Sequence, residues 1–254
     1  MIASLGMYDP AECQPANDRY WALIRDGLRA RGLPAPDTLT RGEAAYWPAW
    51  QAADLVLSQT CGFPYRARLH GKVTLIGTPD FGVDGCPPGY YRSLFLARND
   101  DPRPLAGFDG GRFTYNDKLS QSGWAAPRNH AQALGLHLPT FLHSGGHLAS
   151  ALAVAERRAD LAAIDAVTWR LILRHDPALC ARRRGEDQTT PTPGLPYIAA
   201  PGADRPALFA VIGAAIASLS AADRDTLGLR GLIAIPAARY LAVPTPQETV
   251  QSAR

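Results

Sequence analysis

Short apolar runs alternate along the chain with stretches whose apolar residues recur at helical spacing. The apolar runs predict strands at 2–8, 54–58, 73–77, 112–115, 161–164 and 195–199. The helical spacing predicts helices at 17–32, 124–134, 148–158, 165–173 and 205–219. In the first of these, Asn17 is predicted to be the N-cap and Gly32 to end the helix. Strands that alternate with amphipathic helices indicate an α/β fold.

Two segments rich in Gly and Pro interrupt this alternation, at Asp80–Gly89 and at Thr189–Pro196. Between them, the apolar segment Tyr90–Arg98 is predicted to cross from one lobe to the other. We therefore expect two α/β lobes, one formed by residues 1–88 with 197–254 and the other by the insert 89–196.

The composition excludes several classes of protein. Hydrophobic residues make up 46% of the 254 residues, more than a disordered chain would have. The 26 Lys and Arg against 23 Asp and Glu give a net charge of +3, too weak and dispersed to indicate nucleic-acid binding. The longest apolar stretch, 208–219, is shorter than the roughly 20 residues of a membrane-spanning helix. The first residues lack the basic segment of a signal peptide, so we expect either a mature chain or a cytoplasmic protein.

The four cysteines form no CxxC pair and no zinc-ligand spacing. Cys61 and Cys86 both lie in segments rich in turn residues. A disulfide between these two cysteines in an oxidising compartment and four unpaired thiols both remain compatible with the sequence.

Polar residues gather where predicted strands end, which is the edge at which open α/β sheets bind ligands. One cluster is Ser58-Gln59-Thr60-Cys61-Gly62, and another is Asn116-Asp117-Lys118-Leu119-Ser120-Gln121-Ser122-Gly123. The hydroxyls of Ser120 and Ser122, together with backbone N–H groups, could hold an anion. Alternatively, one of these serines caps the following helix.

Two further clusters contain His147 and Asp165, each at the predicted start of a helix. The flexible Ser-Gly-Gly between His143 and His147 does not suit metal ligation, and we predict no metal site. Asp165 could contact a ligand or cap its helix. Tyr8 and Tyr91 could line a pocket, although core packing explains most such aromatic residues equally well. The sequence has no G-x-S-x-G, P-loop or G-x-G-x-x-G motif, and we predict no catalytic residue and no cofactor.

Taken in order, these clusters resemble the phosphate- and phosphonate-type substrate-binding proteins of ABC transporters. The resemblance covers nearly the whole chain. The segments that carry it are Leu5-Gly6-Met7-Tyr8-Asp9, residues 54–62, Tyr91-Arg92-Ser93, residues 116–123, Gly145-Gly146-His147 and residues 159–165.

The resemblance implies a type II periplasmic-binding-protein fold, in which two lobes close over the ligand. It implies that Ser120, Ser122 and Gly123, with Gln121 in the same loop, hold an oxyanion. His147 would add a hydrogen bond, and Asp165 would face a donor or cationic group of the ligand. The other lobe would contribute Tyr8, Tyr91 and the loop formed by Ser58, Gln59 and Thr60.

The leading hypothesis is therefore a non-catalytic binding protein for a small ligand with a phosphate, phosphonate or related oxyanion group. Such a protein would be a periplasmic monomer whose partner is an ABC permease. The main alternative is a cytoplasmic enzyme on the same fold, similar to chorismate dehydratase or to the pyrimidine-precursor synthases. A third hypothesis is a ligand-sensing module that docks on a cytoplasmic partner.

Overall fold

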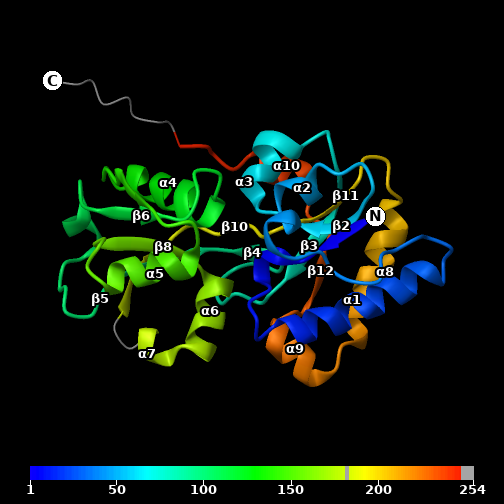
Figure 1. Cartoon of the computed structure of the whole chain (residues 1–254). Helices are drawn as coiled ribbons and strands as arrows, with labels where there is room; N and C mark the ends of the chain where they lie inside the picture. Colours follow the sequence, from blue (N-terminus) through cyan, green and yellow to red (C-terminus); the bar gives the residue numbers. More distant parts are fainter. Residues whose placement is uncertain (181–182, 247–254) are drawn as a thin grey trace. The chain divides into compact units, whose positions relative to one another are not determined.

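The computed structural model describes residues 1–180 and 183–246 (Figure 1). The chain divides into two units: unit 1 contains Met1–Tyr91 and Pro191–Tyr240, and unit 2 contains Arg92–Thr190 and the residues from Leu241 onward. Each unit is an α/β structure with one five-stranded sheet. The predicted fold class is confirmed.

The sheet of unit 1 has the order β1-β2-β11-β3-β12. Its strands are β1 (Ile2–Ser4), β2 (Leu55–Gln59), β3 (Thr74–Asp80), β11 (Tyr197–Ala199) and β12 (Gly231–Ile233). Strands β1 and β2 are parallel, whereas β11 is antiparallel to both of its neighbours, β2 and β3. A separate two-stranded ribbon pairs β4 (Tyr90–Tyr91) with β10 (Thr192–Pro193).

Helices cover both faces of this sheet (Figure 1). One group is α1 (Gln14–Arg29), α8 (Arg205–Ser218) and α9 (Ala221–Leu227). The other group is α2 (Trp47–Trp50), α3 (Gly62–Pro64) and α10 (Ala237–Leu241). The short helical turns of this unit are η1 (Gly6–Tyr8), η2 (Gly42–Ala45) and η3 (Tyr65–Leu69). Helices α1 and α8 approach closely at Gly27, where an added Cβ would lie 2.9 Å from Val211 Cγ1.

Unit 2 has a sheet of order β7-β6-β8-β5-β9. Its strands are β5 (Ser93–Arg98), β6 (Phe113–Tyr115), β7 (Thr140–His143), β8 (Leu161–Asp165) and β9 (Arg183–Gln188). The helices are α4 (Ala126–Ala133), α5 (His147–Ala155), α6 (Ala166–His175) and α7 (Pro177–Cys180), with the turns η4 (Leu105–Phe108) and η5 (Gln121–Ala125). Strands β6, β7 and β8 are parallel, so their carboxyl ends lie at one edge of the sheet.

Strands β5 and β8, which are neighbours in the sheet, explain the core of unit 2. Side chains alternate between the two faces of a strand. Along β5, Leu96 packs in one apolar cluster with residues of α5, while Phe95 and Ala97 pack in a second cluster with Phe108. Both strands are buried on both faces, which explains why each reads as a continuous apolar run in the sequence.

Several sequence predictions need correction. Asn17 is not a cap: α1 begins at Gln14, with Pro15 in its first turn, and Asn17 Nδ2 donates to the Tyr8 carbonyl (3.1 Å) from inside the helix. The predicted strand 2–8 ends at Ser4, because a 3₁₀ turn follows. The predicted crossover 90–98 agrees with the structure, because the chain passes from unit 1 to unit 2 between Tyr91 and Arg92.

The units divide at 91/92 and 190/191, whereas the predicted lobes divide at 88/89 and 196/197. The largest difference concerns the end of the chain, which we predicted to belong to the first lobe. Of the described residues, 241–246 group with unit 2. There Asn129 Nδ2 donates to the Pro244 carbonyl (2.8 Å), and this bond attaches the segment to α4.

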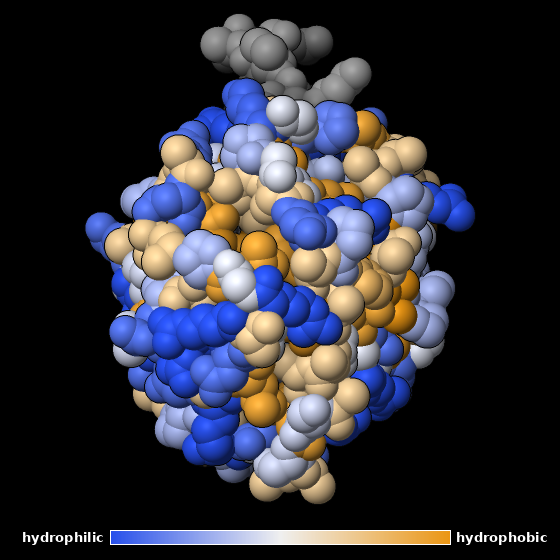
Figure 2. All heavy atoms as spheres, turned by 90° about the vertical axis from the view of Figure 1, so that its right-hand side faces the viewer, coloured by the Kyte–Doolittle hydropathy of each residue, from blue (hydrophilic) through white to orange (hydrophobic). Residues whose placement is uncertain are grey.

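The surface formed by the described residues of unit 1 shows no large apolar face in the view of Figure 2. The face that carries α1 and α8 intersperses hydrophilic and hydrophobic residues (Figure 2). Within the described residues, no single helix is long and apolar enough to cross a membrane, and α8 and α9 pass that test only as a pair bent by 113°.

Cys61 is buried and Cys86 half-buried, both as thiols. The predicted disulfide between them stays a prediction, which thiol titration of the unreduced, denatured protein tests.

Tyr240 stabilises unit 1 from the end of the chain. Its hydroxyl contacts Thr78 Oγ1 and donates to the Gly194 carbonyl (3.0 Å), and its side chain is 1% exposed. Because Tyr240→Phe leaves these buried groups without a partner, we expect the free energy of unfolding to fall by about 1–3 kcal/mol in urea titrations. Tyr46→Phe is the matched control, since the Tyr46 hydroxyl bonds the Gly6 carbonyl at an exposed position. Equal effects of the two variants would contradict this assignment.

Candidate functional site

The carboxyl ends of β6, β7 and β8 carry the polar clusters of unit 2. After β6 ends at Tyr115, the chain forms a turn and enters η5. Ser120 caps η5: its Oγ accepts a hydrogen bond from Gly123 N (3.0 Å), and its carbonyl accepts one from Ala125 N (3.0 Å). The capping alternative for this serine is therefore confirmed. A hydroxyl that accepts a bond still has its own hydrogen to donate, so the cap leaves Ser120 able to bind an anion.

Ser122 joins this turn to two other elements. Its Oγ lies 2.9 Å from Nε2 of His147, the first residue of α5, and its carbonyl accepts a bond from Ser93 Oγ (2.9 Å). Ser120, Gln121 and Ser122 are all buried. The structure thus brings together the predicted residues Ser120, Gln121, Ser122, Gly123 and His147. Their contacts with a ligand stay predictions.

His147 is uncharged at neutral pH. Burial of its ring lowers the pKa to about 4, although the nearby Ala163 carbonyl acts in the opposite direction. A neutral imidazole carries one N–H, and the position of that hydrogen decides what Ser122 can do. If Nε2 carries it, the ring donates to Ser122 Oγ and leaves the serine hydrogen for a ligand. If Nε2 is bare, Ser122 donates to the ring instead.

Asp165 ends β8 and begins α6. One carboxylate oxygen, Oδ1, accepts bonds from Val167 N (2.7 Å) and Thr168 N (3.0 Å), so the predicted alternative of an N-cap is confirmed. The side chain is 2% exposed. Its contact with a donor or cationic group of the ligand stays a prediction.

In unit 1, the predicted residues on β2 have protein partners. Ser58 Oγ lies 2.6 Å from Ser4 Oγ and accepts a bond from Trp50 Nε1 (3.1 Å). Gln59 Nε2 donates to the Leu195 carbonyl (3.3 Å). These bonds join β2 to its neighbours, and a ligand role of either side chain stays a prediction.

Thr60 differs from the two residues before it. Its Oγ1 is buried and has no hydrogen-bond partner in the described part of the chain. The aromatic ring of Tyr8 packs edge-on against Phe81, with 4.9 Å between centroids. Tyr91 is buried on β4, where it pairs with Thr192. Tyr8 and Tyr91 therefore belong at least to the packing of unit 1.

Sequence reasoning missed Ser4 and Ser93 as part of these networks. Each is a single serine in or beside an apolar strand, and each bonds another predicted residue, Ser4 to Ser58 and Ser93 to Ser122. The sequence signal that could have found them is a serine within an apolar strand. Such a hydroxyl is expected to be buried, and a buried hydroxyl nearly always has a partner.

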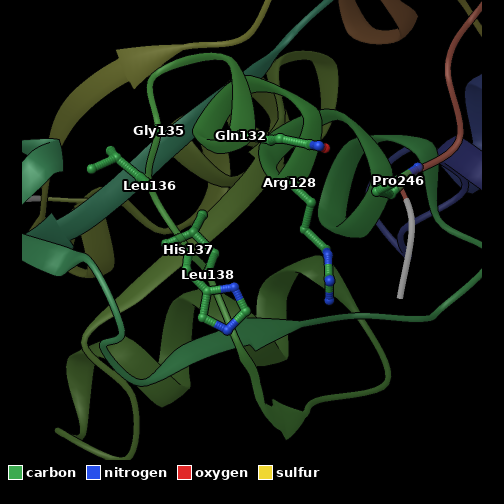
Figure 3. A pocket seen from close by; sticks show the side chains of 7 residues that line it. All are labelled: Arg128, Gln132, Gly135, Leu136, His137, Leu138 and Pro246. Atoms are coloured by element: carbon green, nitrogen blue, oxygen red, sulfur yellow. The ribbon is translucent and has the colours of Figure 1, made fainter. Parts of the chain in front are cut away.

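A surface hollow of about 310 Å³ also lies in unit 2 (Figure 3). The side chains of Arg128 and Gln132 on α4 line it, together with the loop after that helix and Pro246. None of the predicted ligand-binding residues lines this hollow. The hollow is therefore separate from the predicted ligand site.

Unit 2 is inserted into the chain of unit 1 and carries the buried serine loop, as expected for a solute-binding protein. A family model for the periplasmic phosphonate substrate-binding protein of ABC transporters matches residues 51–239. The chain belongs to this family. The family consists of binding proteins and not of enzymes, and its members act with a small-molecule ligand and a permease. No curated protein matched the sequence.

Solved structures show the same fold. XAC2383 from Xanthomonas citri, bound to ATP, has 18% identity and a TM-score of 0.69, with 94% of each chain covered. PhnD1 from Prochlorococcus marinus, in complex with methylphosphonate, has 16% identity, a TM-score of 0.69 and the same coverage. A binding-protein component of an ABC phosphonate transporter from Pseudomonas aeruginosa has 14% identity and a TM-score of 0.64 over 92% of this chain and 81% of that one. The predicted periplasmic-binding-protein fold is confirmed, and the enzyme alternative is not favoured.

The low pKa of His147 predicts a specific pH dependence of stability. Between its ordinary value of 6.5 and about 4, the unfolded chain takes up a proton that the folded chain does not. The free energy of unfolding should therefore fall as the pH falls through this range, by at most about 3 kcal/mol from this residue. In His147→Gln this part of the slope should disappear in urea titrations from pH 7 to pH 4. His143→Gln is the matched control, and a wild-type slope in His147→Gln would contradict the assignment.

Proposed function

We propose that this chain binds its ligand through a phosphorus oxyanion and that Ser120 and Ser122 of unit 2 donate hydrogen bonds to that group. The observation that carries the proposal is the buried loop in which both serines have their oxygens fixed by protein partners. Ser120 accepts from Gly123 N, and Ser122 lies against His147. A ligand would meet hydroxyls that are already oriented, so little entropy is lost on binding.

The chemistry of this loop fits an anion that must be both bound and released. Hydroxyls and the first N–H groups of a helical turn supply donors without a formal charge. Since His147 is neutral at pH 7, it contributes a dipole and a hydrogen bond and not an ion pair. We infer that the Nε2–H tautomer of His147 is the binding form, because it leaves the Ser122 hydrogen for the ligand.

In this proposal unit 1 also contributes ligand-binding residues. Thr60 is its strongest candidate, since its buried Oγ1 has no partner among the described residues. Tyr8 and Tyr91 would flank the ligand, and Ser58 and Gln59 would hold the loop that carries Thr60. Asp165 would contact a donor group on the part of the ligand away from the oxyanion.

The names of the structural relatives support a phosphorus oxyanion over a particular molecule. Methylphosphonate in PhnD1 and ATP in XAC2383 share a phosphorus centre with charged oxygens and differ in the rest of the molecule. The fold alone does not select this chemistry, because a similar structure from Rhodopseudomonas palustris, MatC, holds malate. The family match, rather than the fold, therefore supports a phosphorus oxyanion. Other residues of the site would select the rest of the ligand.

We further propose that the chain works in the periplasm as a monomer and delivers its ligand to an ABC permease. The family match supports the compartment and the permease. A ligand-sensing role would instead require a cytoplasmic partner. Fractionation of cells that express the full-length gene product, followed by gel filtration of the purified protein, tests location and oligomeric state together.

Replacement of both serines tests the proposed site. A thermal-shift panel of methylphosphonate, inorganic phosphate, ATP and methanesulfonate first identifies a binding compound, since a ligand of the native state raises the melting temperature. For that compound, Ser120→Ala with Ser122→Ala should lower the affinity at least tenfold in calorimetry. Each lost hydrogen bond to a charged group costs about 1.5–3 kcal/mol.

A control separates the loss of binding from the loss of a helix cap. Ser220 caps α9 by accepting a bond from Asp223 N (3.0 Å), as Ser120 caps η5. Ser220→Ala should lower stability by about 1 kcal/mol and leave the affinity unchanged. Wild-type affinity in a folded double serine variant would refute the proposed site.

A further inference from the structure

Neighbouring atoms leave no room for a side chain at Gly123. The φ angle of Gly123 is not positive, so its backbone conformation suits other residues as well. A Cβ at this position, however, would lie 1.9 Å from Oδ1 of Asn116 and 3.2 Å from Cε1 of His147. The missing side chain therefore makes room for the carboxamide of Asn116, which rests directly on the serine loop.

Folding alone does not explain a polar side chain in this position. The carboxamide oxygen of Asn116 is buried and has no hydrogen-bond partner within residues 1–180 and 183–246. A buried acceptor without a partner destabilises the native state, and an apolar side chain of the same shape would avoid that cost. Orphaned polar groups of this kind call for a specific explanation, such as a ligand that is bound in the working protein.

The other end of the same carboxamide provides that explanation. The NH₂ group and Oδ1 lie on opposite sides of Cγ, so contact of Oδ1 with Gly123 turns the NH₂ away from the glycine. Asn116 directly follows β6, and it is half-buried although its oxygen is not accessible. It lies at the sheet edge where Ser122 and His147 meet.

We propose that Asn116 is a further ligand-binding residue, whose NH₂ group donates a hydrogen bond to the oxyanion held by Ser120 and Ser122. The inference rests on the proposed function of the serine loop. It assigns a role to each end of the side chain: the oxygen packs on Gly123 and fixes the orientation of the carboxamide, and the nitrogen contacts the ligand. Gly123 then acts as a positioning residue for Asn116.

Asn116→Leu separates binding from folding, because leucine fills a similar volume and has no polar atom. With methylphosphonate as the probe, we expect calorimetry to show an affinity at least tenfold weaker than that of the wild type. The melting temperature of the ligand-free variant should equal or exceed the wild-type value, since the orphaned acceptor is gone. If Asn116→Leu does not fold, Asn116→Ala provides the same measurement of affinity.

Asn129→Leu is the matched control in the same unit. Asn129 lies on α4, after the serine loop, and donates to the Pro244 carbonyl. Its replacement should lower the melting temperature and leave the affinity for methylphosphonate unchanged. Asn116→Leu and Asn129→Leu are thus expected to give opposite results in the two measurements.

A double-mutant cycle tests the role of Gly123. Gly123→Ala should weaken binding by displacing the carboxamide, and this loss should largely vanish when residue 116 is already Ala. Additive losses would overturn the positioning role.

The outcomes distinguish this inference from the proposed function. If Asn116→Leu binds methylphosphonate like the wild type while the double serine variant does not, the role of Asn116 is refuted and the proposed function stands. If the double serine variant keeps wild-type affinity, the proposed site is refuted and the inference falls with it.

Discussion

The hydrogen bond from Ser93 Oγ to the Ser122 carbonyl holds the candidate site in place. Ser93 begins β5, an inner strand of the unit 2 sheet, and Ser122 lies in the turn after β6. The bond therefore connects a short loop to an inner strand of the sheet. It adds to the cap at Ser120 and to the contact of Ser122 with His147, which also fix the two serines.

The same loop depends on how the sheet is built. Three parallel strands end at Tyr115, His143 and Asp165, which places three polar loops at one edge. The helices that follow β7 and β8 begin there with His147 and with the cap of Asp165. A parallel arrangement is needed for this convergence, because an antiparallel strand would send every second loop to the opposite edge.

Sequence patterns predicted many of the strands and helices. They failed where contacts between neighbouring strands or residues decide the structure. Strand β8 was predicted because both of its faces are apolar, whereas the apolar segment that contains β5 was predicted only as a crossover. Strand β9 (Arg183–Gln188) was not predicted, since its sequence RRGEDQ is charged, and only pairing with β5 makes it a strand. Asn17 shows the same limit: it has the chemistry of a cap, but Pro15 sets the start of the helix earlier.

For the site, residue type and position at strand ends predicted the serine loop, His147 and Asp165, but not their networks. A sequence contains no sign that Ser122 lies against His147, or that the Asn116 carboxamide occupies the space beside Gly123. These two contacts join residues that are 25 and 7 positions apart in the chain. For Ser58 too, the sequence contains no sign that its hydroxyl is bonded to Ser4 and Trp50.

The uncharged state of His147 connects folding with binding. Burial removes the charge that an anion site would seem to require, since transfer of an imidazolium out of water is costly. An anion held by neutral donors alone gains less from attraction but avoids the desolvation of a buried ion pair. A binding protein that releases its ligand to a permease does not need the highest possible affinity. The proposed site would therefore use hydroxyls whose oxygens have protein partners before a ligand binds.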